Sequence, residues 1–144
     1  MTEQREDEEL SFPEPPEGLV KPAEDSVVAF LDGPDQVEAA MEQLVAEGFD
    51  SDRIYVLCGT EGARRLDVSG KHHGLKGRVY RLVEWMSDEK GILFRARDHL
   101  EAGGLVMSVP ADEDQKGGAA LILGAHGAHG MAHFGRDHWE PLGA

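Results

Sequence analysis

The sequence predicts an α+β fold of the ferredoxin-like, split β-α-β type, with a four-stranded, mainly antiparallel sheet and helices on one face. Short runs of β-branched and apolar residues alternate with longer segments whose apolar residues recur about every 3.6 positions. The order strand, helix, strand occurs twice along the chain. Between the second and third strands, a further segment predicts an inserted helical hairpin.

The first β-α-β unit has the clearest pattern. The run SVVAFLD at 26–32 is typical of a buried strand, and Asp32 through Asp35 supplies a cap and a proline suited to a first helical turn. RIYVLC at 53–58 predicts the second strand. The helix between them ends at Gly48 and presents an apolar face made of Val37, Ala40, Met41, Leu44 and Val45.

The second half predicts a hairpin, a strand, a helix and a last strand. The hairpin spans about 75–102 and closes at Gly103-Gly104. LVMSVP at 105–110 is the third strand, 113–126 a glycine-rich helix, and 130–142 the last strand. The apolar residues of the first hairpin helix are Leu75, Val79, Leu82, Val83 and Met86, and those of the second are Ile92, Leu93, Ala96 and Leu100.

The first 24 residues predict a disordered tail, and residues 25–144 a single domain. The tail holds eight acidic residues, two basic residues and four prolines, a composition that cannot bury enough apolar surface to become ordered. A solubilising leader is one interpretation. The other is a strand that docks on a partner or on the domain.

The charge balance excludes two classes of partner. The chain has 14 Lys and Arg against 28 Asp and Glu, a net charge of −14, which disfavours nucleic acids and anionic membranes. No apolar run approaches the roughly 20 residues of a membrane span. The lone cysteine, Cys58, cannot form an internal disulfide, so we expect a cytoplasmic protein.

The segment Gly59–Gly74 predicts a small-ligand site. After a strand it turns, with a short helix over 61–66, and its glycines can direct backbone N–H groups towards an anion. It matches neither a P-loop nor a dinucleotide-binding motif, so the alternative is a structural loop with Asp67 as a cap. The candidate ligand-binding residues are Gly59, Gly62, Arg64, Asp67, Gly70 and His73.

A histidine cluster near the C-terminus is a second candidate site. His126, His129 and His133 have a nitrogen ligand suited to Zn, Ni or Cu. The sequence contains no HExxH motif, and no cysteine accompanies them, so histidines that face water are the alternative.

Catalysis has one candidate pair, Asp67 and His73, which would act as acid and base if the fold brought them together. No nucleophile elbow accompanies them. The sequence therefore favours a protein that is not an enzyme and needs no cofactor.

The order of these motifs resembles the bacterial general stress or heat-induced stress protein domain family and its small actinobacterial-type relatives. The resemblance runs from about Val27 to Leu142. Its most specific part is the spacing of Gly62, Leu66, Asp67, Gly70, His73 and Gly74. It implies a stress-associated setting and no particular reaction.

Together these observations predict a non-catalytic, stress-associated binding or interaction module. We expect it to form a homodimer through a sheet edge or open sheet face, and to bind a protein partner not identified by the sequence. A metal-binding protein that uses the C-terminal histidines is the alternative, and a small enzyme with Asp67 and His73 is the third.

Overall fold

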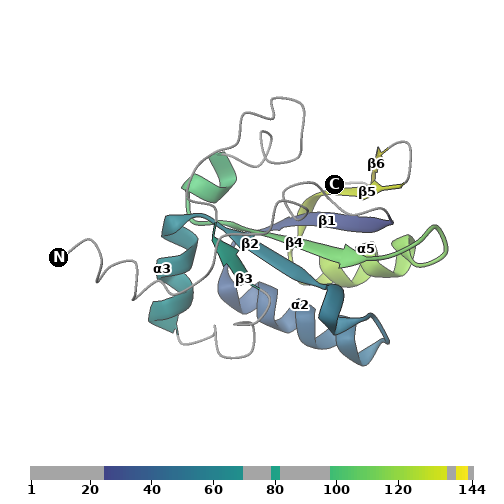
Figure 1. The fold of residues 1–144 in the computed structure, drawn as a ribbon, viewed down its shortest axis with the longest axis horizontal. Helices are drawn as coiled ribbons and strands as arrows, with labels where there is room; N and C mark the ends of the chain where they lie inside the picture. The colour runs from purple at the N-terminus through teal and green to yellow at the C-terminus, as the bar shows by residue number, and fades with distance from the viewer. Residues whose placement is uncertain (1–24, 70–78, 82–97, 136–138, 143–144) are drawn as a thin grey trace.

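A six-stranded sheet organises the part of the chain that the structure, a computed structural model, describes: residues 25–69, 79–81, 98–135 and 139–142. The fold is α+β, as predicted (Figure 1). The strands are β1 (Ser26–Leu31), β2 (Tyr55–Cys58), β3 (Val79–Arg81), β4 (Leu105–Pro110), β5 (His129–Phe134) and β6 (Trp139–Pro141). The helices are α2 (Pro34–Ala46), the 3-10 turn η2 (Ser51–Arg53), α3 (Thr60–Ser69) and α5 (Lys116–Ala125).

The strand order is β3-β2-β4-β1-β5-β6. The β2–β3 pair is parallel and the other four pairs are antiparallel. The expected number of four strands is wrong, because the sheet gains β3 at one edge and β6 at the other. Residues 79–81, expected in a helix, pair with β2 instead, and the expected last strand is divided into β5 and β6.

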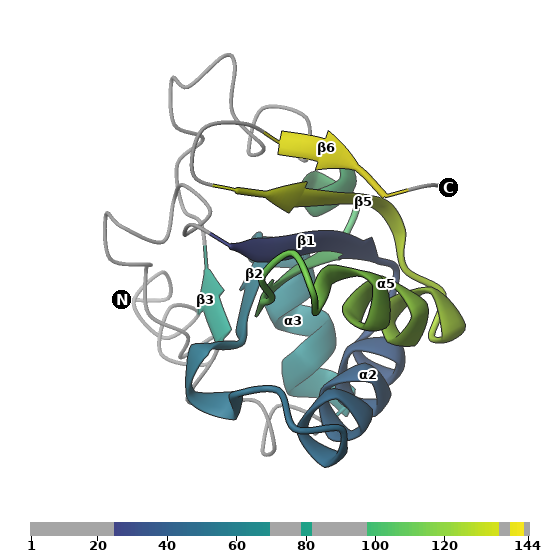
Figure 2. The same cartoon turned by 90° about the vertical axis from the view of Figure 1, so that its right-hand side faces the viewer.

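Helices α2 and α5 pack on one face of the sheet and against each other (Figure 2). Because side chains alternate along a strand, every second residue of β1 and β4 faces this core. The core residues from these two strands are Val27, Ala29, Leu31, Leu105, Met107 and Val109. The other residues of β1, Ser26, Val28 and Phe30, alternate with these and therefore point to the opposite face.

Several expectations lie outside the described residues. These are the tail at 1–24, most of the predicted hairpin, and both Gly70 and His73. The end of the hairpin is described: residues 98–101 are helical, and Gly103 (φ +98°) stops the helix as predicted. The amide of Gly104 donates to the carbonyl of His99 at 2.9 Å, a Schellman-type closure. Among the helices described, none is long and apolar enough to cross a membrane.

The glycines of α5 leave room for a stability test. A Cβ added at Gly117 would meet nothing within 4 Å, and the residue is exposed within the helix. We expect Gly117→Ala to raise the free energy of unfolding by about 0.5–1 kcal/mol, because alanine loses less backbone entropy in a helix. Urea denaturation measures this change. An unchanged or lowered stability would contradict the described position of Gly117 in α5.

Candidate functional site

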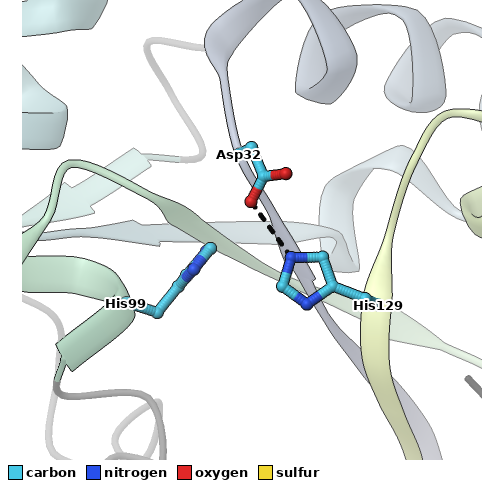
Figure 3. Close-up of side chains that lie close together, drawn as sticks. All are labelled: Asp32, His99 and His129. Atoms are coloured by element: carbon cyan, nitrogen blue, oxygen red, sulfur yellow. Dashed lines mark hydrogen bonds and ion pairs between the residues drawn. The ribbon is translucent and has the colours of Figure 1, made fainter.

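Asp32, His99 and His129 meet beside the end of β1 and form what we call the Asp32 site (Figure 3). Asp32 directly follows β1, His99 lies in the helical turn at 98–101, and His129 is the first residue of β5. One potential ligand atom from each of the three lies within 4.8 Å of the others. The site thus combines two imidazoles and a carboxylate from three separate segments.

The Asp32 carboxylate contacts His129. Nε2 of His129 lies 3.0 Å from Oδ1 of Asp32 and donates to it. This hydrogen bond is the main cause that holds the pKa of Asp32 below its ordinary value, so the carboxylate is ionised at neutral pH. The sequence predicts Asp32 as a helix cap. Instead, the backbone N–H groups of Asp32 and Gly33 donate to Oε1 of Gln36, and Gly33 is the N-cap.

His99 is fixed by backbone carbonyls. Its Nε2 lies 2.8 Å from the carbonyl oxygen of Leu31 and 3.1 Å from that of Leu105. Carbonyl oxygens only accept, so Nε2 carries a hydrogen, and in the neutral ring Nδ1 is the nitrogen able to bind a metal. The ring stacks on Phe30 with centroids 5.1 Å apart and planes 18° apart. These contacts set both the tautomer and the orientation of His99.

The side of the sheet on which His129 lies is decided by a β-bulge. The β1–β5 register shifts between Val28 and Phe30, and Gly130 there has a φ of +62°. His129 is consequently paired with Phe30 and lies edge-on to the His99 ring, at 5.4 Å between centroids. His133, four residues later, pairs with Val27, a core residue. Without the bulge, the two histidines of one strand would share a face.

Arg65 in α3 joins the backbone segments that carry the site. Its Nη1 donates to the carbonyl oxygen of Asp32 at 2.8 Å and to that of Gly103 at 2.7 Å. Its positive charge also contributes to lowering the pKa of Asp32. Arg65 is therefore a positioning residue for the loop after β1 and for the end of the His99 helix. The residue predicted from the sequence is its neighbour, Arg64.

The predicted ligand segment is mostly helix where it is described. Gly59 precedes α3, while Gly62, exposed Arg64 and Asp67 lie within it. The helix begins at Thr60 and ends at Ser69, so it is longer than the short helix expected over 61–66. Gly62 lies close to the sheet, where an added Cβ would be 3.1 Å from Cβ of Cys58. A ligand role for this segment remains a prediction.

The structure does not bring the three predicted histidines together. Nε2 of His126 lies 2.7 Å from Oε1 of Gln43, at the surface between α2 and α5. His129 belongs to the Asp32 site, and His133 is buried with its Nε2 2.8 Å from the carbonyl oxygen of Ala111. His99, the missing partner of His129, was not among the candidates, because it lies 30 residues away in a stretch that only signals a helix.

Compared with protein-family models, with curated protein sequences and with solved structures, the chain has no match. The resemblance to the stress-protein family therefore stays a prediction. What the Asp32 site can do has to be inferred from its own donor atoms.

Two imidazoles and one carboxylate make a donor set that Zn²⁺ and other divalent transition metals accept. In such sites the histidine commonly donates its second N–H to a backbone carbonyl or a carboxylate, as His99 does here. His129 is 46% and Asp32 67% exposed at the side chain, so an ion can reach them from solvent.

Proposed function

We propose that the protein is a non-catalytic binding module that holds a divalent transition-metal ion, such as Zn²⁺, at the Asp32 site. The observation that carries this proposal is the convergence of Asp32, His99 and His129, with a potential ligand atom of each within 4.8 Å of the others. The 3.0 Å between Nε2 of His129 and Oδ1 of Asp32 also suits the proposal. Two ligand atoms of one tetrahedral zinc ion lie roughly 3.3 Å apart.

The proposed ion would take the place of a hydrogen. Nε2 of His129 now donates to Asp32, and for that nitrogen to bind the metal its hydrogen has to move to Nδ1 of the same ring. The carboxylate needs no deprotonation at neutral pH, because its pKa is lowered. His99 needs only to contribute Nδ1, since its other nitrogen is bonded to backbone. With both rings neutral, binding requires no net loss of a proton, which is consistent with binding near neutral pH.

The fold type and the assembly belong to the same proposal. Strand β4 lies between β1 and β2, and β1 lies between β4 and β5, which supports a ferredoxin-like core with β3 and β6 added at its edges. Those two edges are the surfaces through which a homodimer would pair. The stress-associated setting and the cytoplasmic location are supported by sequence composition and resemblance alone.

Zinc titration of the full chain tests the metal site. We expect Zn²⁺ to raise the melting temperature, with a stabilisation of about 2.7 kcal/mol at a free concentration 100 times Kd. Asp32→Asn combined with His129→Asn should remove one equivalent of bound zinc, counted by native mass spectrometry. His126→Asn is the matched control, because His126 contacts Gln43 outside the site.

Two results would contradict the proposal. One is a double variant that binds as many zinc ions as the unsubstituted chain, with the same affinities. The other is an equal loss of zinc in the His126→Asn control, which would place the binding elsewhere.

A further inference from the structure

One ring nitrogen of His133 lacks a hydrogen-bond partner among the residues that the structure describes. The side chain is completely buried, and its Nε2 donates to the carbonyl oxygen of Ala111 at 2.8 Å. Its Nδ1 has no hydrogen-bond partner within the described chain. Oε2 of Glu113 lies 3.8 Å from it, which is too far for a hydrogen bond.

Such a buried nitrogen is unusual, since nearly all buried polar atoms in proteins are hydrogen-bonded. In a neutral ring, Nδ1 presents a lone pair close to the carboxylate of Glu113, and neither group can donate to the other. In a protonated ring, the charge would form an ion pair with Oε2 of Glu113 at 3.8 Å, but Nδ1–H would have no hydrogen-bond acceptor among the described residues. A cation between Nδ1 and the carboxylate would give Nδ1 the partner that it lacks among the described residues.

Two carboxylates converge on this nitrogen. Glu113 lies in the turn between β4 and α5, and Glu140 on β6 is directly paired with His133 on β5. A potential ligand atom from each of Glu113, His133 and Glu140 lies within 4.8 Å of the others. We call this group the His133 cluster. It lies apart from the Asp32 site, because the β-bulge turns His133 and His129 to opposite faces of the sheet.

A cation already interacts with these carboxylates. Nζ of Lys116 donates to Oε1 of Glu113 at 2.7 Å and also contacts Oε1 of Glu140. No contact joins Lys116 to Nδ1 of His133, which remains unpartnered despite the nearby positive charge.

We infer that Glu113, His133 and Glu140 form a second metal site, suited to Zn²⁺, and that Lys116 competes with the metal for the two carboxylates. A nitrogen ligand beside two carboxylate oxygens favours Zn²⁺ over Ca²⁺ or Mg²⁺, which take oxygen ligands. Lys116 is the first residue of α5 and its side chain is 23% exposed, so the ammonium can turn into solvent when the ion binds. The ion then bonds to the unprotonated Nδ1 and displaces no hydrogen from the neutral ring.

The test uses the full chain with the Asp32 site removed by Asp32→Asn and His129→Asn. We expect this chain to bind one Zn²⁺ by native mass spectrometry and calorimetry. Adding Lys116→Met should tighten that binding about three- to tenfold, because the ion no longer has to displace two partly exposed ion pairs. Adding Glu140→Gln to the Lys116→Met chain should abolish it. Asp114→Asn is the matched control, since it removes an exposed carboxylate of the same turn that is outside the cluster.

The role of His133 is tested by NMR and not by substitution, because replacing a fully buried side chain can unfold the protein. In the Lys116→Met chain, nitrogen NMR should show the Nδ1 resonance of His133 shift on addition of Zn²⁺ while Nε2 stays protonated. Two results would overturn the inference. One is that no zinc binds, with or without Lys116, and the other is that Lys116→Met and Glu140→Gln leave the zinc affinity unchanged. Lys116 would then be the permanent cation of the cluster. Neither result bears on the Asp32 site, which is absent from this chain and is tested by its own zinc titration.

Discussion

Gly104→Ala is expected to lower the free energy of unfolding by about 1–3 kcal/mol, the usual cost of an overpacked site. A Cβ at residue 104 would lie 2.3 Å from Nε2 of His99, so the ring would have to leave its position. It would then lose both backbone carbonyls and its stacking on Phe30. Zinc binding at the Asp32 site should weaken in parallel. Urea denaturation and zinc calorimetry measure the two effects.

A double-mutant cycle isolates the cause of that loss. Gly104 is not among the residues with positive φ, so strain of the alanine backbone is not the source of the cost. In a His99→Ala background, Gly104→Ala should cost less than about 0.5 kcal/mol, because the clashing ring is gone. Gly117→Ala serves as the control for glycine removal in open space. An equal cost in both backgrounds would show that His99 does not set the requirement for glycine at 104.

The elements predicted best are those whose pattern is local. β1 and β4 are apolar runs in the centre of the sheet, and α2 shows an apolar face at helical spacing after Pro34. Burial requires apolar residues at these positions, so the apolar pattern predicts each element to within a few residues. The prediction of helix at β3 is wrong, because the three residues Val79 to Arg81 are too few to show the alternating pattern of a strand. Their strand conformation depends on the partner β2, which is distant in the sequence.

The Asp32 site could not be predicted because each of its residues also has a local explanation. Asp32 precedes a helix and resembles a cap, and His99 lies in a segment with helical spacing. The spacing of His129 and His133 predicts that both lie on one face of the strand, but the bulge at Gly130 places them on opposite faces. The signal present in the sequence is the glycines after two of these histidines: Gly103-Gly104 follow His99, and Gly130 follows His129.

Gly62→Val is expected to lower the free energy of unfolding by about 1–3 kcal/mol, because α3 lies close to the sheet at this residue. An added Cβ would lie 3.1 Å from Cβ of Cys58 and 3.3 Å from the carbonyl oxygen of Gly104. A valine would push the helix away from β2 and disturb the loop that supports His99. Urea denaturation measures the change, and Arg64→Ala, at an exposed position of the same helix, is the control.

Gly62→Val also separates the two explanations of the Gly59–Gly74 segment. If Gly62 is required for packing, stability and zinc affinity at the Asp32 site fall together, since Gly104 lies between Gly62 and His99. If Gly62 instead contacts a small ligand, as the sequence predicts, ligand binding is lost while stability stays near that of the unsubstituted chain. Because the Cβ position is already enclosed by Cys58 and Gly104, we expect the first result. Glycine at 62 would then be explained by the close approach of α3 to the strands.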